Sequence, residues 1–264
     1  APREKAFVAL QRMISPDIAV KDWKNALKKI NIYKSFFGEG NKKILNLISI
    51  LEAKSDNTIK ITSVGSGINT TSGGEYVPVI SADDKLLYFC AKGRNDNLGG
   101  EDIFVSTKSS GSWSSAKLVS GLSSSYENDA PLSITADGNT ILLFKGGKLY
   151  YSDKTKTGWS EAIEFSETIN SGNWQADAMI SSDGKALFFV STKQGGHNLY
   201  TGNTAHGGFH GDNLHPADIY VSVRNKNNEW GSPINIGSVI NTQYCDRMPF
   251  LHPDMKTLYF SSDG

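Results

Sequence analysis

The sequence predicts an all-β propeller of four-stranded blades, preceded by a small α-helical region. A turn built around an aspartate occurs four times, and a short apolar run lies before and after each turn. Three of these copies continue into a third strand, a tryptophan and a fourth strand. A unit of this kind cannot bury both of its faces alone. We therefore expect the units to stack on one another around a central axis.

The four turns are close copies of one another. They read Ser81-Ala82-Asp83-Asp84-Lys85, Thr135-Ala136-Asp137-Gly138-Asn139, Ser181-Ser182-Asp183-Gly184-Lys185 and His252-Pro253-Asp254-Met255-Lys256. Asp-Gly and related pairs provide the positive φ angle that a tight hairpin requires. The turn aspartates are 54, 46 and 71 residues apart. This spacing indicates blades of similar length, with an insertion of about twenty residues at positions 194–216 in the third one.

Each complete copy has a tryptophan after its third strand, at Trp113, Trp159 and Trp230. Because these residues recur at one repeat position, we expect them to pack between blades rather than to bind a ligand. A short fourth strand is expected after each of them.

Residues 1–57 are predicted to be helical, and residues 58–264 to form the propeller, incomplete at its C-terminus. A helix is expected to begin at Ser15-Pro16-Asp17, with serine as the cap, proline in the first turn and an acid at the positive end of the helix dipole. The residues expected on its apolar face are Ala19, Trp23, Ala26, Leu27, Ile30, Tyr33 and Phe37. These helices are interpreted either as tetratricopeptide-like or as a cap packed on the propeller.

The segment at residues 59–62 has the form of a fourth strand without the three strands that should precede it. We expect it to become the outer strand of the last blade, which would remove an exposed sheet edge. The last copy ends after its second strand. The chain is therefore predicted to be truncated after about three and a half blades, out of roughly five to seven in the intact protein.

The most specific motif is the last one, INTQYCDRMPFLHPDMKTLYFSSDG at residues 240–264. With its weaker copies from residue 59 onward, it resembles the WD-repeat-like propeller repeat of TolB and of many Bacteroidetes envelope proteins. It is similar to the version in OmpA-family, peptidoglycan-associated proteins, which combine tetratricopeptide helices, a propeller and an OmpA domain. A type IX secretion component has this layout.

The resemblance implies a periplasmic protein associated with the outer membrane, with other envelope proteins as partners. Peptidoglycan would be contacted through a domain that is not in this chain. The 27 basic and 27 acidic residues give a net charge of zero, so bulk charge does not favour nucleic acid as a partner. No apolar run has the length of a membrane span. Cys90 and Cys245 are expected to be unpaired thiols.

The residues expected on the functional face lie where one blade leads into the next. The candidates for binding a partner or ligand are Glu75, Tyr76, Asp129, Trp174, Asp177, Asp246 and Arg247. Glu75, Asp129 and Asp246 share one repeat position. These acids are interpreted either as bonding a neighbouring loop or as a ring at the mouth of the channel. Trp174 does not recur, so it is either an aromatic anchor for a partner or sugar, or a local packing residue.

No catalytic residue and no cofactor are predicted, because no hydrolase elbow, zinc-protease motif or phosphate loop occurs in the sequence. His206, His210 and His215 are weak metal candidates in a glycine-rich stretch without a cysteine partner. The predicted function is a non-catalytic protein–protein interaction scaffold. The alternatives are a propeller that binds or hydrolyses glycans, and a propeller that gates a peptidase.

Overall fold

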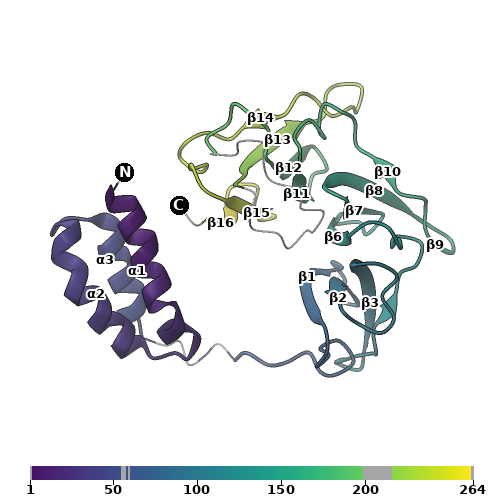
Figure 1. Ribbon diagram of the computed structural model, residues 1–264. Coiled ribbons are helices and arrows are strands. Elements are labelled where there is room, and N and C mark those ends of the chain that lie inside the picture. Colours follow the sequence, from purple (N-terminus) through teal and green to yellow (C-terminus); the bar gives the residue numbers. More distant parts are fainter. Residues whose placement is uncertain (1, 55–57, 59, 199–215, 263–264) are drawn as a thin grey trace. The chain divides into compact units, whose positions relative to one another are not determined.

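The computed structural model describes residues 2–54, 58, 60–198 and 216–262 of the chain (Figure 1). It divides into two compact units, Ala1–Thr62 and Ser63–Gly264. The first unit is helical and the second is made of strands. No helix among these residues is both long enough and apolar enough to cross a membrane.

The helical unit contains α1 (Pro2–Ala19), α2 (Trp23–Phe37) and α3 (Lys42–Glu52). Its core consists of Leu10, Ile14, Ala26, Ile30, Phe37 and Ile44, all of which are buried. Two residues that were predicted on the inward face of the second helix, Trp23 and Tyr33, are instead 42% and 46% exposed.

The predicted helix start at Ser15-Pro16-Asp17 is wrong, because Pro16 lies inside α1. The chain turns later, at Lys21, which has a φ of 60°. Asp22 then caps α2 by accepting a hydrogen bond from Asn25 N at 3.0 Å. Asp17 does not act as a helix-start residue, because its carboxylate reaches across to α2 and pairs with Lys29 at 2.7 Å.

The second unit consists of antiparallel sheets that form three propeller blades and a further hairpin, as the sequence predicts (Figure 1). The first blade contains β1 (Gly74–Ile80), β2 (Leu86–Lys92), β3 (Glu101–Ser109), β4 (Ser112–Trp113) and β5 (Lys117–Leu118). The second contains β6 (Asp129–Ile134), β7 (Thr140–Lys145), β8 (Lys148–Thr155), β9 (Gly158–Trp159) and β10 (Ile163–Glu164). The third contains β11 (Gln175–Ile180), β12 (Ala186–Ser191), β13 (Asp218–Val223) and β14 (Ile234–Asn235), and the hairpin contains β15 (Asp246–Leu251) and β16 (Leu258–Ser262).

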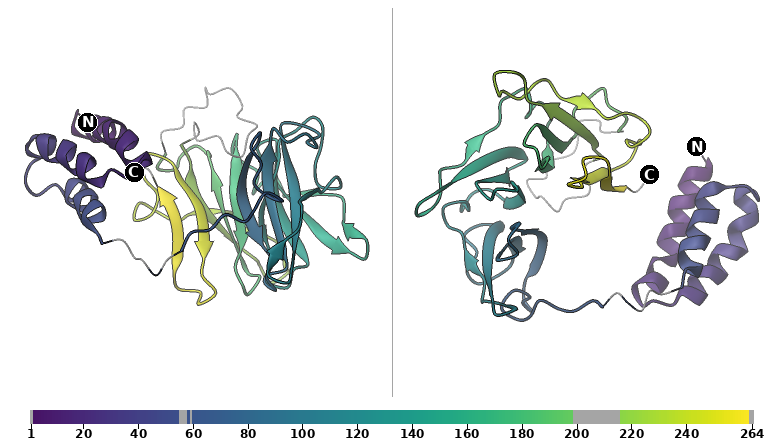
Figure 2. Two further views of the ribbon diagram at one scale, coloured as in Figure 1. Left: turned by 90° about the horizontal axis from the view of Figure 1, so that it is seen from below. Right: turned by 180° about the vertical axis from the view of Figure 1, so that it is seen from behind.

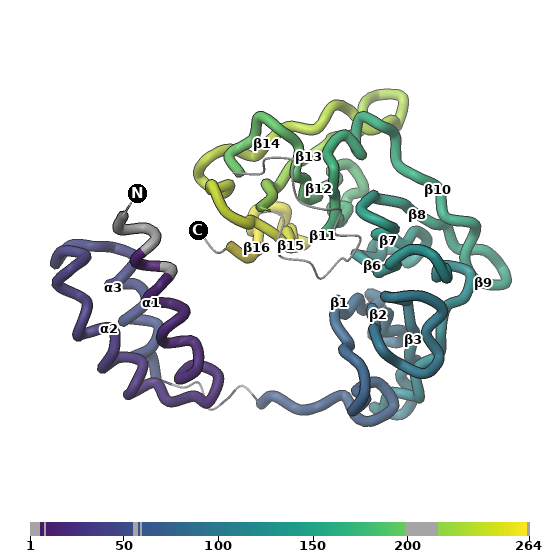
Figure 3. The backbone as a smooth tube through the Cα atoms, in the orientation of Figure 1, coloured from purple at the N-terminus to yellow at the C-terminus, as the bar shows by residue number. Residues whose placement is uncertain are grey.

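The first strand of each blade lies next to the first strand of the following blade. β1 contacts β6, β6 contacts β11, and β11 contacts β15. The views from below and behind show the sheets of this unit arranged side by side about these inner strands (Figure 2). The backbone trace shows that the strands of each blade follow one another outward from the inner strand. The chain then returns inward to start the next blade (Figure 3).

The aspartate turns have the predicted geometry. In three of them a hydroxyl donates to the turn carboxylate at 2.6 Å, from Ser81 to Asp83, from Thr135 to Asp137 and from Ser181 to Asp183. The same hydroxyls accept the first N–H of the next strand at 2.9 to 3.0 Å. These hydroxyl hydrogen bonds lower the pKa of all three aspartates. Each of these turns is therefore closed by hydrogen bonds of its own side chains, so that the local sequence is enough to predict it.

Each inner strand contains a bulge near its start. In three of the four the bulged residue is not glycine yet has a positive φ, namely Val77 at 53°, Asp177 at 50° and Met248 at 54°. A bulge re-aims the neighbouring side chains and increases the local twist. The candidate site residues therefore stand on irregular backbone at the innermost part of each blade.

The recurring tryptophans pack between blades in two of the three cases. Trp159 of the second blade lies edge-on to Tyr88 of the first, with ring centroids 6.0 Å apart. Trp230 of the third blade packs in a cluster with Leu142 and Tyr151 of the second. Trp113 packs against the core of its own blade. The predicted packing between blades is confirmed for Trp159 and Trp230.

The predicted outer strand near residue 60 is not formed. Residues 60–64 are assigned to no strand, and Ile61 is 90% exposed. The apolar alternation that predicts the strand is present, but among the described residues no sheet edge pairs with it.

An asparagine in the loop between blades ties the loop to the third strand of the blade before it. Asn170 accepts a hydrogen bond from Leu149 N at 2.9 Å and donates to Leu149 O at 3.0 Å and Phe165 O at 3.1 Å. Asn241 makes the equivalent pair with Ile219 at 2.8 and 2.9 Å. In the first blade Ser123 replaces the asparagine and accepts only Ile103 N, at 3.0 Å.

We predict that Asn170→Ala lowers the free energy of unfolding by about 2 kcal/mol, because both backbone groups of buried Leu149 lose a partner. Chemical denaturation of the variant and the wild type measures the change. Asn139→Ala is the matched control, since the side chain of Asn139 bonds only an exposed turn carboxylate, and its free energy of unfolding should stay within about 0.5 kcal/mol of the wild type. Equal losses in the two variants would contradict the assigned role of Asn170.

Candidate functional site

The predicted site residues all lie at the starts of the four inner strands. Glu75, Asp129, Gln175 and Asp246 occupy the same position in β1, β6, β11 and β15. The shared position brings them to the same end of neighbouring strands. The third blade has an amide in place of the acid.

The repeated acids bind the loops that precede them. Glu75 accepts hydrogen bonds from Thr70 N at 3.2 Å and Thr70 Oγ1 at 2.6 Å. Asp129 accepts from Ser124 N at 2.6 Å and Ser124 Oγ at 2.8 Å. Asp246 accepts from the N–H of the equivalent loop threonine. The loop-bonding interpretation is therefore the correct one.

A ring of solvent-facing acids at a channel mouth is not formed. Asp129 and Asp246 are 0% exposed, and the side chain of Glu75 is 8% exposed. The carboxylates are held inside the fold because the backbone N–H groups that they accept lie in the loops packed around them. Sequence analysis identified the right residues but could not fix which way their side chains point.

Two of these acids have cationic partners from their own blades. Arg94 pairs with Glu75 at 3.4 Å and lies over the ring of Phe104, with its guanidinium carbon 4.6 Å from the ring centroid. Lys145 forms an ion pair with Asp129 and donates to Leu122 O at 3.2 Å. Burial raises the pKa of Asp129, and the hydrogen bond from Lys145 opposes that rise. Each acid therefore links a loop, a strand and a cation in one buried network.

Tyr76 and Cys90 form a second buried polar group, on the side of the first blade that faces the second. The Tyr76 hydroxyl donates to Glu101, and Glu101 N donates to Asn128 Oδ1 of the next blade at 3.0 Å. Cys90 Sγ lies 3.6 Å from the carbonyl oxygen of Asp129. Burial is the largest cause of the raised pKa of both Tyr76 and Cys90. No disulfide involves Cys90 or Cys245.

Trp174 is not an exposed anchor, because it is only 2% exposed. Its ring packs against Phe144 of the second blade, with centroids 6.0 Å apart. The guanidinium carbon of Arg247, from the following hairpin, lies 4.8 Å from its centroid. The packing interpretation of Trp174 is the correct one.

Asp177 and Arg247 connect the third blade to the following hairpin. Arg247 Nε donates to Asp177 Oδ2 at 2.8 Å and Nη2 donates to Oδ1 at 3.2 Å. Met248 N donates to the same carboxylate at 3.2 Å. The Asp177 side chain is 0% exposed and that of Arg247 is 13% exposed. This two-pronged ion pair is therefore a structural link rather than a free charged surface.

Sequence analysis missed two further buried acids, Asp102 and Asp218. Asp102 accepts hydrogen bonds from Leu98 N at 2.7 Å and Gly99 N at 2.9 Å, and Asp218 accepts from His197 N at 2.6 Å. They hold the loops between the second and third strands of their blades. The sequence signal that could have found them is the repeated Asp-Ile-aromatic at the start of the third strand.

The metal candidates His206, His210 and His215 lie outside the described residues. Among the residues that the structure does describe, no group of three or more histidine, cysteine, aspartate or glutamate side chains is arranged to hold a metal ion.

No protein-family model and no curated protein matches the sequence. Three solved structures resemble the chain. A candidate TolB from Agrobacterium tumefaciens is 17% identical, with a TM-score of 0.43 over 72% of this chain and 59% of that one. A candidate 6-phosphogluconolactonase from Bacteroides uniformis is 14% identical, with a TM-score of 0.39 over 70% and 46%.

The third is a protein from Lactobacillus plantarum, 12% identical, with a TM-score of 0.37 over 72% of this chain and 45% of that one. The chain thus spans about half the length of the structures that it resembles. Matches at this level of identity and similarity carry no argument about function.

We predict that Arg247→Met lowers the free energy of unfolding by about 3 kcal/mol, because it removes the charged partner of the buried Asp177 carboxylate. The double variant with Asp177→Asn should recover part of the loss, and denaturation of all four proteins gives the coupling energy. The control is Lys148→Met, which breaks an exposed pair with Glu164 of similar length, 2.7 Å. Its expected cost is below about 1 kcal/mol. If the change in unfolding free energy of the double variant equals the sum of the changes in the two single variants, a direct Asp177–Arg247 interaction is contradicted.

Proposed function

We propose that this chain is a non-catalytic protein–protein interaction scaffold of the bacterial periplasm and outer membrane, within a peptidoglycan-associated or secretion-machinery assembly. The observation that carries the interaction role is an apolar groove in the helical unit. The envelope location and the kind of assembly rest on the resemblance of the repeat motif to OmpA-family proteins.

The groove lies between α1 and α2 and has a volume of about 390 Å³. Its lining consists of Ala6, Ala9, Leu10, Met13, Tyr33, Phe36 and Phe37. Phe36 is 60% exposed and Tyr33 is 46% exposed, although both are large aromatic side chains. Contiguous exposed apolar surface of this kind is typical of protein-interaction sites, and aromatic residues contribute most to their binding energy.

The charge of the helical unit favours an acidic partner. Residues 1–62 contain 12 basic and 6 acidic residues, although the whole chain is neutral. A unit with a net positive charge and an apolar groove favours a partner with apolar anchors and acidic residues beside them. Binding should therefore weaken as the salt concentration rises.

The engagement of the inner-strand polar groups supports a non-catalytic role for the propeller face. Glu75, Asp129 and Asp246 accept hydrogen bonds from the inter-blade loops, and Tyr76 donates to Glu101. Groups held in this way maintain the blade contacts.

We predict that Tyr33→Ser combined with Phe36→Ser abolishes capture of envelope partners and leaves the fold intact, because both side chains are already exposed. The measurement is a crosslinking pulldown from envelope fractions of the native source, with the purified chain as bait. Wild-type chain should recover outer-membrane or secretion-machinery proteins, and less of them at high salt.

Ile50→Ser is the matched control, because Ile50 is 70% exposed and lies on α3 outside the groove lining. It should recover the same partners as the wild type. Recovery of identical proteins by the groove variant and the wild type would remove the groove from the proposal. Failure of the wild type to recover any envelope protein would overturn the envelope scaffold itself.

A further inference from the structure

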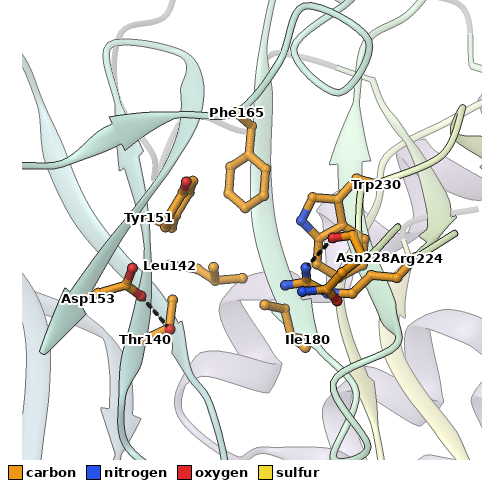
Figure 4. Close-up of a pocket in the computed structure, with 9 residues that line it drawn as sticks. All are labelled: Thr140, Leu142, Tyr151, Asp153, Phe165, Ile180, Arg224, Asn228 and Trp230. Atoms are coloured by element: carbon orange, nitrogen blue, oxygen red, sulfur yellow. Dashed lines mark hydrogen bonds between the residues drawn. The ribbon is translucent and has the colours of Figure 1, made fainter. Parts of the chain in front are cut away.

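A cleft of about 270 Å³ opens between the second and third blades (Figure 4). It is lined by Ile180 at the end of β11, whereas the repeated acid position lies at the start of that strand. The second blade and its outer loop supply one wall, with Thr140, Leu142, Tyr151, Asp153 and Phe165. The third blade supplies the other, with Ile180, Arg224, Asn228 and Trp230. Neither wall belongs to the loop-bonding network of the inner strands.

The guanidinium group of Arg224 is held in a fixed position in one wall. Its Nε donates to Gly184 O at 3.1 Å and its Nη1 donates to Asn228 O at 2.7 Å. Its central carbon lies 4.1 Å from the ring centroid of Trp230. Nη2 has no acceptor among the described residues, and Figure 4 shows the guanidinium directed toward the cleft. An arginine held in this way presents its remaining donors without a further loss of side-chain entropy.

Trp230 adds a neutral donor beside the guanidinium. Figure 4 shows its indole nitrogen on the edge of the ring that faces the cleft. The equivalent tryptophan of the preceding blade, Trp159, has the Tyr88 hydroxyl as a polar neighbour. Burial raises the pKa of Tyr88, and the hydrogen bond with the Trp159 side chain opposes that rise. In the register of the repeat, Leu142 stands where Tyr88 does. Trp230 therefore has no such hydroxyl, and its N–H is bonded to no residue that the structure describes.

The remainder of the cleft combines apolar side chains with the polar groups of Thr140, Tyr151, Asp153 and Asn228. Leu142 and Phe165 are buried and Ile180 is half-buried, and Phe165 packs edge-on to Tyr151 with centroids 5.2 Å apart. Asp153 stands on the wall across from Arg224, where its Oδ1 accepts the Thr140 hydroxyl at 2.6 Å. This carboxylate is exposed and disfavours ligands that carry more than one negative charge.

We propose that this cleft binds a small organic carboxylate with an apolar body. The carboxylate would accept hydrogen bonds from Arg224 and from the Trp230 indole, and the body would lie against Leu142, Phe165 and Ile180. Arginine matches a carboxylate with two parallel N–H donors. A sugar fits less well, because the guanidinium of Arg224 already covers one face of Trp230.

The cleft between the first and second blades provides an internal comparison. It is smaller, about 200 Å³, and Lys154 and Tyr88 take the places of Arg224 and Leu142. It therefore lacks both the planar donor group and the uncommitted indole N–H. The proposed site is specific to one of two otherwise similar clefts, and it is independent of the groove in the helical unit.

The test is a titration of the purified chain with 3-phenylpropionate, its neutral amide 3-phenylpropanamide and the cation 3-phenylpropylamine, followed by NMR of the tryptophan indole signals and by calorimetry. The acid should bind about tenfold or more tightly than the amide, because only the acid carries a negative charge that pairs with the guanidinium. The amine should not bind measurably. The Trp230 indole signal should shift and that of Trp159 should not.

Arg224→Gln should remove the preference for the acid, and Lys154→Gln, at the equivalent position of the other cleft, should leave it unchanged. Leu142→Tyr should abolish binding by filling the cleft with the side chain that the other cleft already accommodates. Because that variant keeps Arg224 and its bonds, it tests the site even if Arg224→Gln proves unstable in a thermal-melt control.

Equal affinity for the acid and the amide, or an unchanged preference for the acid in folded Arg224→Gln, would overturn the proposal. Absence of saturable binding by the acid would also overturn it. The carboxylate could come from a polypeptide C-terminus or from a free small molecule. A short peptide ending in phenylalanine, compared with its C-terminal amide, distinguishes the two. Competition by the peptide acid alone would assign the site to a polypeptide C-terminus, and no competition would assign it to a free small carboxylate.

Discussion

The propeller unit depends on one hydrogen-bonded bridge that is repeated between its blades. An asparagine of the inter-blade loop binds both backbone groups of a residue in the preceding third strand. A hydroxyl residue of the same loop donates its backbone N–H to the acid that opens the following inner strand. Asn241 and Asp246 show the two halves of the bridge within six residues. A four-stranded blade cannot bury its own faces, so the position of each blade relative to its neighbour must be specified. The bridge is complete before the hairpin, where the loop is bound at both ends. Before the second blade Ser123 replaces the asparagine, and at the start of the third blade Gln175 replaces the acid.

Each junction between blades adds its own contact to this bridge. The hydrogen bond from Glu101 N to Asn128 joins the first blade to the second, and Tyr76 of the first blade donates to the Glu101 carboxylate. An aromatic contact between Phe144 and Trp174 joins the second to the third. The buried ion pair of Asp177 and Arg247 joins the third to the final hairpin. Because the bridge sets the geometry, these contacts can differ in chemistry without changing the architecture, and they also distinguish one junction from another.

This arrangement explains why conspicuous polar residues need not mark a ligand site in a repeat protein. Buried carboxylates satisfy loop N–H groups that would otherwise be unpaired, which is a structural requirement. The features left over are those that the bridge does not use. One is an apolar groove with exposed Tyr33 and Phe36 in the helical unit. The other is a cleft in the propeller unit, where Arg224 is held by two backbone carbonyls and its Nη2 has no acceptor among the described residues. The two suit different ligands, a protein surface in the first case and a small anion in the second.

The sequence by itself determined the features that are closed by near neighbours. The aspartate turns, the alternation of apolar strands and the repeated position of the tryptophans all depend on contacts within a few residues, or on a period that repetition makes visible. The same reasoning failed at Ser15-Pro16-Asp17, because these residues lie inside α1, where Asp17 pairs with Lys29 of the next helix.

Only the tertiary structure decided which side chains point inward and which residues pair across blades. Asp177 and Arg247 are 70 residues apart in the chain, and no local pattern relates them. Trp174 is buried against Phe144 from another blade, and each acid is held inward by the loop N–H group that it accepts. Side-chain direction at a bulge and contact between distant segments are properties of packing, and a pattern of residue types along one chain does not contain them.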